Sequence, residues 1–269
     1  MIFSIPALSG ALFLAIPEVK RTGSISFLFH KKAFVSGTLY FVSQFLIILS
    51  AERNGSIMTA LSVLLADSVL TPVVSIALKL NSSRIIYPLF LIAMALVVPS
   101  ATLLTIYGKN IGVSGVYGLL LVIGIILTLP AFFIILNSHI SKNGLLRGVS
   151  SSFFWPGLIG LIVGITIFQR SFEFNWEASV VSLLLAGFTS MGAAYLLYFW
   201  AVQENGFALP GLLQSMIPIF TALLVFVFEK ESLSLISILL MITEAVGATI
   251  ALFSIESNDK RSDNKYQRI

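Results

Sequence analysis

The sequence predicts an all-α, polytopic membrane protein built as a helical bundle, and two observations carry that prediction. Of its 269 residues, 57% are hydrophobic and only 10% are charged, whereas a soluble domain carries about a quarter charged residues. The apolar residues also form runs of about the 20 residues with which an α-helix crosses the hydrocarbon core. Nine transmembrane helices are predicted, near residues 2–17, 33–50, 57–78, 85–107, 113–137, 151–169, 178–201, 207–228 and 233–254.

Short polar or charged turns separate these spans. In chain order, the turns are Glu18–Arg21, Glu52–Gly55, Asn81–Arg84, Gly108–Asn110, Ser141–Gly144, Gln169–Ser171, Gln203–Gly206 and Glu229–Glu231. The first span has no basic residues before it and no small-residue cleavage site after it, so it is not predicted to be a signal peptide. The sequence has no cysteine, which excludes disulfides and thiolate chemistry.

Basic residues set the predicted orientation of the chain. With the tail after span 233–254 in the cytoplasm, twelve of the sixteen Lys and Arg residues fall on the cytoplasmic side: Lys20, Arg21, Lys31, Lys32, Lys79, Arg84, Lys142, Arg147, Lys260, Arg261, Lys265 and Arg268. Only Arg53, Lys109, Arg170 and Lys230 fall outside. This is a clear positive-inside bias, and it explains the net charge of +4 without nucleic-acid binding.

The chain also resembles itself at a separation of about 150 residues. The segment Phe3–Gly10 aligns with Phe153–Gly160, and Ala51–Gly55 aligns with Val202–Gly206. The matched Asn-Gly turns fall on opposite sides of the membrane, which predicts an inverted-topology repeat of the kind found in secondary transporters. Chance similarity among apolar helices is the competing explanation.

Three sections of chain follow from this repeat. Residues 1–109 are predicted to form a first repeat of four helices, and residues 110–255 a second repeat of five. Residues 256–269 are predicted to be a disordered cytoplasmic tail. The first repeat has no counterpart of span 113–137. We therefore expect that its first helix is missing, or that the true start codon lies further upstream.

Residues in the second half resemble a known family. The Tyr-bearing segment Met191–Val202 is followed by Gln203–Gly206, then by Leu213–Leu224 with its serine-to-proline stretch, and then by Phe228–Glu231. This order is similar to helices eight to ten of the EamA-like transporters, in the drug/metabolite transporter superfamily. The resemblance implies a ten-helix inverted-repeat carrier with both termini in the cytoplasm. Nine spans, and acidic residues inside two of them, depart from that pattern.

Asp67 is the first of those acidic residues and the leading candidate for a transport site. It lies near the middle of span 57–78, and a charge at this depth costs at least about 2.5–3.5 kcal/mol. The functional interpretation is that Asp67 binds a proton or a cationic substrate group in a central cavity. The alternative is a protonated or hydrogen-bonded carboxyl that serves packing.

Other polar groups inside the spans complete the candidate set. The candidates for the substrate or proton pathway, besides Asp67, are Tyr40, Ser43, Gln44, Thr71, Tyr195, Tyr198, Gln214 and Ser215. They could form an aromatic-walled cavity between the repeats or make ordinary interhelical contacts. Pro72 and Pro218 would each free a backbone carbonyl. Glu244, the second acidic residue, is predicted to be a structural hydrogen-bonding group between helices.

Several function classes lack their sequence signatures. No phosphate-binding loop, metal-ligand cluster or potassium-filter motif is found, and His30 and His139 are interpreted as lone loop residues. We therefore predict no catalytic residues, no metal and no cofactor. The predicted partners are a small-molecule substrate and the bilayer of a cell membrane; a homodimer stays open. The leading function is an exporter of a small metabolite or amphipathic compound that works by alternating access, with proton coupling at Asp67. The alternatives are a non-transporting scaffold or incomplete carrier, and a nucleotide-sugar or lipid-linked-sugar carrier.

Overall fold

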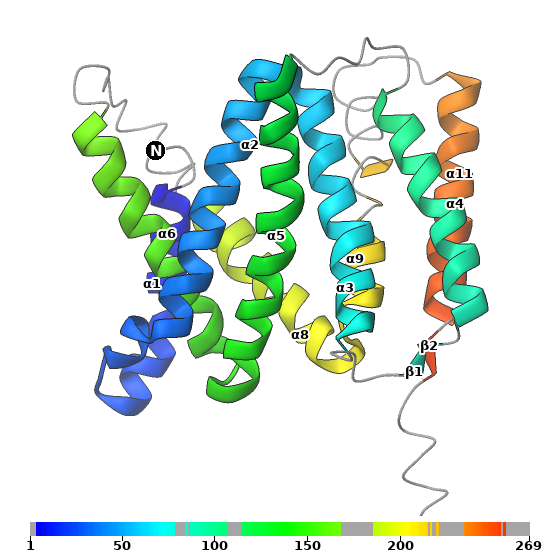
Figure 1. Cartoon of the computed structure of the whole chain (residues 1–269). Coiled ribbons are helices and arrows are strands. Elements are labelled where there is room, and N and C mark those ends of the chain that lie inside the picture. The colour runs from blue at the N-terminus through cyan, green and yellow to red at the C-terminus, as the bar shows by residue number, and fades with distance from the viewer. Residues whose placement is uncertain are drawn as a thin grey trace, which may run out of the picture. The chain divides into compact units, whose positions relative to one another are not determined.

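A computed structural model of the chain describes residues 4–78, 84–85, 87–106, 115–167, 185–214, 216, 219–220, 234–253 and 255–256. Within these residues the protein is helical, apart from one pair of two-residue strands (Figure 1). It divides into two compact units, and each unit takes one segment from each half of the chain. Unit 1 comprises Met1–Ile48 and Leu127–Gln203, and unit 2 comprises Leu49–Ile126 and Glu204–Ile269. Two long helices, α2 (Lys31–Leu64) and α5 (Gly115–Asn143), contribute to both units.

Unit 1 packs α1 against α6 and closes around an aromatic core. Its other elements are one end of α2 and one end of α5, a short 3₁₀-helix, a π-helix and α8. The bounds are α1 Ser4–Thr22, η1 Ser26–Phe29, α6 Leu145–Ile167, η3 Gly187–Ala194 and α8 Tyr195–Asn205. Small residues allow close contact: a Cβ placed at Gly157 of α6 would lie 2.7 Å from the backbone nitrogen of Leu8.

Unit 2 packs α4 against α11 and α3 against α9. Its elements are η2 Leu65–Leu70, α3 Thr71–Ala77, β1 Arg84–Ile85, α4 Tyr87–Ile106, α9 Ala208–Gln214, α11 Leu235–Phe253 and β2 Ile255–Glu256, with the remaining parts of α2 and α5. The strands form an antiparallel pair in which Arg84 is opposite Glu256. The sequence pattern did not predict these strands.

The described helices overlap the predicted spans and extend beyond several of them. α1 continues to Thr22, through the charged turn at which the sequence predicted an end. α5 continues to Asn143, and α6 begins at Leu145, so only Gly144 separates them. Gly144 has φ +87°, a left-handed conformation that glycine adopts without a Cβ penalty. Hydropathy measures the membrane-crossing part of a helix, so it misses turns that continue into the polar region.

The predicted break at Glu52–Gly55 is a bend inside a continuous helix. α2 keeps helical geometry from Lys31 to Leu64, yet the hydroxyl of Thr59 donates to that of Ser50 at 2.9 Å. Nine residues of straight helix would separate these two residues by about 13.5 Å along the axis. The helix must therefore turn back on itself between them.

Three described helices are long and apolar enough to cross a membrane by length and composition: Lys31–Asn54 within α2, α5, and Leu145–Thr166 within α6. Shorter apolar helices cover Ser62–Ser75, Pro88–Ser100 and Leu235–Ile250. Together with the apolar composition, this is a multi-pass helical architecture. Of the predicted disordered tail, residues 256–269, Glu256 lies in β2 and residues 257–269 lie outside the described residues.

Candidate functional site

Asp67 lies in the π-helix η2, which directly precedes α3 and its Pro72. The backbone N–H and the hydroxyl of Thr71 both donate to the carbonyl of Ala66, the hydroxyl at 2.8 Å. A bond from residue 71 to residue 66 is the wide π-helical kind, which is rare and often found at functional sites. Pro72 has no N–H, so it cannot close the next turn of the helix. The predicted role of Pro72 as a functional helix break stays a prediction.

The Asp67 carboxyl is only partly satisfied in unit 2. Its Oδ1 atom is shielded from solvent and has no hydrogen-bond partner among the described residues. The Asp67 backbone carbonyl faces α9, where a Cβ placed at Gly211 would lie 2.8 Å from the carbonyl oxygen and 2.8 Å from Pro72 Cγ. One turn further along α9, Gln214 Oε1 is also buried, with no partner in the described part of the chain. Within those residues, this part of unit 2 presents two oxygen acceptors without donors.

The predicted tyrosines gather in the aromatic core of unit 1. The Tyr40 ring is 1% exposed and its centroid lies 6.0 Å from that of Tyr195. The Tyr40 hydroxyl donates to the Met191 sulfur at 3.3 Å. Tyr198 joins the same cluster through Phe133, at a centroid distance of 5.3 Å. The structure thus brings the three tyrosines together in one aromatic core, and their predicted role in a substrate or proton pathway stays a prediction.

Three phenylalanines in this core were not predicted. Phe132, Phe133 and Phe153 are each at most 1% exposed. Phe132 and Phe153 contact Tyr40 or Tyr195 edge-on or tilted, and Phe133 stacks on Tyr195. Apolar residues of this kind are indistinguishable from ordinary span residues in the sequence. The only local signal is that each of these phenylalanines lies within three residues of an intrahelical proline, Pro130 or Pro156.

The other candidate residues make local contacts or lie outside the described residues. Ser43 and Thr71 are buried, and each hydroxyl donates to a carbonyl of its own helical segment. Such bonds satisfy the hydroxyl without involving a neighbouring helix. Gln44 is partly buried. Ser215 and Pro218 lie outside the described residues, so their predicted roles stay predictions.

Glu244 is placed differently from the sequence expectation. Its side chain is 0% exposed on α11, but neither carboxyl oxygen has a hydrogen-bond partner among the described residues. The interhelical hydrogen bond predicted for Glu244 is therefore not seen in this part of the chain.

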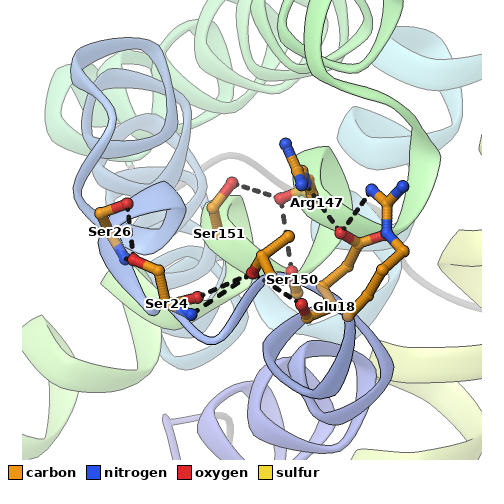
Figure 2. Close-up of polar contacts among 8 residues, drawn as sticks. Glu18, Ser24, Ser26, Arg147, Ser150 and Ser151 are labelled. Atoms are coloured by element: carbon orange, nitrogen blue, oxygen red, sulfur yellow. Dashed lines mark hydrogen bonds and ion pairs between the residues drawn. The ribbon is translucent and has the colours of Figure 1, made fainter.

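An ion-pair cluster at one end of unit 1 was also not predicted. Glu18 Oε2 accepts hydrogen bonds from Arg147 Nε at 2.7 Å and from Arg21 at 3.0 Å (Figure 2). The hydrogen bond from Arg147, followed by that from Arg21, lowers the pKa of Glu18 below its ordinary value of 4.5. The pair joins α1 to α6 across 129 residues of sequence, so no local pattern could have indicated it.

His139 is not a lone loop residue; that interpretation was wrong. It lies within α5, is 1% exposed, and its ring centroid is 4.7 Å from that of His30. Asn143 Nδ2 donates to its Nδ1 atom at 3.0 Å, and Nε2 lies 2.9 Å from Ser151 Oγ. Since Nδ1 accepts, Nε2 carries the proton and donates.

That tautomer decides what the histidine and serine can do. The Ser151 hydroxyl donates to the Arg147 carbonyl at 2.6 Å. A nucleophilic serine would have to donate to an unprotonated imidazole nitrogen instead. The pair is therefore a structural hydrogen-bond chain rather than a nucleophile and base. Among the described residues, no group of three or more His, Cys, Asp or Glu side chains is placed to hold a metal ion.

Comparisons with known proteins give a fold and a family match over part of the chain. A solved crystal structure superposes on this chain with a TM-score of 0.76 over 94% of this chain and 88% of that chain, at 15% sequence identity. At that identity, the likeness shows the fold alone. No curated protein matches the sequence. Residues 145–253 match the EamA-like transporter family. Over that stretch, the chain is similar to the EamA-like transporters of the drug/metabolite transporter superfamily.

Proposed function

We propose that this chain is a secondary transporter of the cell membrane. It exports a small metabolite or amphipathic compound by alternating access, and proton movement is coupled to transport at Asp67. The observation that carries this proposal is the Asp67 site: an acid in a π-helical segment, with one shielded oxygen that has no partner within the described ranges.

The local chemistry explains why Asp67 would exchange a proton. An ionised carboxylate in the hydrocarbon region costs at least about 2.5–3.5 kcal/mol unless something compensates it. No donor from the residues that the structure describes compensates Oδ1. The carboxyl is therefore neutral in this state, and it ionises when water or a cationic group reaches it. A transporter that opens alternately to each side delivers water to such a group.

Antiparallel packing of equivalent helices supports the inverted repeat. In unit 2, Val97 of α4 contacts the position of Gly247 in α11, and the two positions are separated by 150 residues in the sequence. In unit 1, Leu8 contacts the position of Gly157, a separation of 149. A two-fold axis in the membrane plane makes equivalent helices antiparallel where they meet near that axis. The α4–α11 pair and the α1–α6 pair are both antiparallel. A parallel repeat would make them parallel.

Contacts between segments predicted on the same side support the proposed grouping of the loops, and the orientation itself rests on the charge bias. On the predicted cytoplasmic side, Glu18 pairs with Arg147 in unit 1, and Arg84 lies opposite Glu256 in unit 2. On the predicted outer side, the Asn54 amide donates to the carbonyl of Gly118 at 3.0 Å. Each pairing joins segments that the charge bias puts together.

The test is transport by the purified chain in liposomes that contain a pH-sensitive dye. A panel of small metabolites and amphipathic amines is supplied with and without a pH gradient. We expect wild-type protein to move at least one compound together with protons, and Asp67→Asn to lose the proton movement. Thr249→Ala is the control, because Thr249 is exposed and bonds only to its own helix.

Two results would count against the proposal. If Asp67→Asn transports with the wild-type pH dependence, Asp67 is structural and the site rests on the tyrosine, glutamine and serine candidates. If folded wild-type protein moves none of the panel, the scaffold alternative is favoured.

A further inference from the structure

A second acid, Glu244, lies in the contact between α11 and α4, which we call the α4–α11 seam. Gly247 of α11 marks this seam, since a Cβ there would lie 2.6 Å from Val97 Cγ2 and 2.9 Å from Leu96 Cβ of α4. Glu244 is three residues earlier, so it shares the Gly247 face of the helix. Its 0% exposure agrees with that position.

The antiparallel register shows what lies opposite Glu244. Because both helices rise equally per residue, a step of three residues back from Gly247 matches a step of three residues forward from Val97. That step leads to Ser100, which is 3% exposed. The Ser100 hydroxyl donates to its own helix at Leu96 and Val97. It therefore does not donate to Glu244, but its oxygen can still accept a hydrogen bond.

No described charge compensates Glu244. α4 and α9, which pack against α11, contain no Asp, Glu, Lys, Arg or His. Tyr87 at the start of α4 is their only titratable residue, and it lies about four turns from the level of Ser100. β2 contributes Glu256, a like charge three turns away along the chain. A buried, unpaired carboxylate in such surroundings is strongly unfavourable.

A metal cation would not solve this problem. Hard cations bound in proteins take six or more oxygen ligands, whereas the described seam offers two carboxyl oxygens and one hydroxyl. A proton needs one carboxyl oxygen, and it converts that oxygen into a donor for the Ser100 hydroxyl oxygen at the same level. The chemistry of the seam therefore fits a proton and no larger cation.

We propose that Glu244 is a proton-binding site in the α4–α11 seam, separate from Asp67. It holds its proton while the seam is closed and exchanges that proton with water only when the seam opens. The proposal does not depend on coupling at Asp67, because it concerns a different carboxyl group, that of Glu244, between a different pair of helices. It makes the second half of the carrier a participant in proton handling.

Infrared difference spectroscopy of the full chain in liposomes tests the protonation state directly. Wild type minus Glu244→Gln at pH 7 should show the C=O stretch of one protonated carboxyl, which moves to lower frequency in D₂O. A pair of carboxylate bands in its place would overturn the proposal, since Glu244 would then be ionised. Glu244→Leu provides the same subtraction if the Gln variant does not fold. Asp67→Asn should keep the band, which separates this result from any failure at Asp67.

The rate of deuterium exchange tests whether the seam is the barrier. Gly247→Ala inserts a Cβ against Val97 and should speed exchange of the carboxyl proton by about tenfold or more, because exchange follows the population of the opened state. Val246→Ala is the matched control, since Val246 is 50% exposed beside it. Equal exchange rates in the two variants would show that the proton leaves by another route.

Discussion

Substitution of Gly157 by alanine measures how tightly α1 and α6 pack in unit 1. The new Cβ would lie 2.7 Å from the nitrogen, 2.8 Å from the Cβ and 2.9 Å from the Cα of Leu8. Non-bonded heavy atoms prefer about 3.5–4.0 Å, so the helices must separate by close to 1 Å. All three atoms are rigid parts of Leu8, so no rotamer change relieves the overlap.

Two opposing effects set the expected magnitude. Overpacking a well-packed contact costs about 1–3 kcal/mol, and the rigid contact argues for the upper half of that range. Alanine is favoured over glycine inside a helix by about 0.8–1.0 kcal/mol. We therefore expect Gly157→Ala to lower the free energy of unfolding by about 1–2 kcal/mol.

The assay is reversible unfolding of the purified protein in detergent, followed by circular dichroism. Gly192→Ala is the matched control, because its Cβ would meet Gly187 O at 3.3 Å and nothing else closer than 4.0 Å. The control should be neutral or slightly stabilising. The reasoning is refuted if Gly157→Ala unfolds with the wild-type free energy or a higher one.

Three further predictions concern charge, hydrogen bonding and orientation. The lowered pKa of Glu18 means that its pairing with Arg147 stabilises the fold fully above pH 4.5 and is lost as pH falls through the folded-state value. At neutral pH, wild type should therefore have a higher Tm than Glu18→Gln, by an amount that corresponds to about 1 kcal/mol in the free energy of unfolding. The two Tm values should converge in acid. His139→Leu should cost about 1–3 kcal/mol in the same unfolding assay, because it leaves buried polar partners unsatisfied; an unchanged stability would contradict the assigned bonds. An impermeant thiol reagent on intact cells should label Ser232→Cys and spare Ser257→Cys, and the reverse pattern would invert the proposed orientation.

Hydropathy located the helices because lipid imposes one requirement on all of them. Every backbone polar group must be satisfied within the segment, so each apolar run of sufficient length becomes a helix. The same signal says nothing about where a helix ends in the polar region. The extensions of α1 to Thr22 and of α5 to Asn143 fall there.

The contacts that distinguish the candidate site could not be predicted, because they join distant parts of the chain. Asp67 could be identified as unusual from its depth alone, but its neighbour Gly211 lies on α9, and no local pattern specifies that pairing. Glu244 shows the limit most clearly. Its burial follows from the sequence, whereas the absence of a described partner depends on which face of α4 it meets.

The composition of the two compact units has a consequence for biogenesis. Each unit joins a segment from the first half of the chain to one from the second, so neither can be completed during synthesis until residues beyond 200 have left the ribosome. Until residues 145–167 have emerged, α1 faces lipid without α6, and the hydroxyl of Ser36 lacks its bond to Ser152. The helices that are synthesised first must therefore stay in the bilayer without their packing partners from the second half of the chain. We expect truncation after residue 126 to leave no stable half-protein, and the membrane quality-control proteases to degrade it.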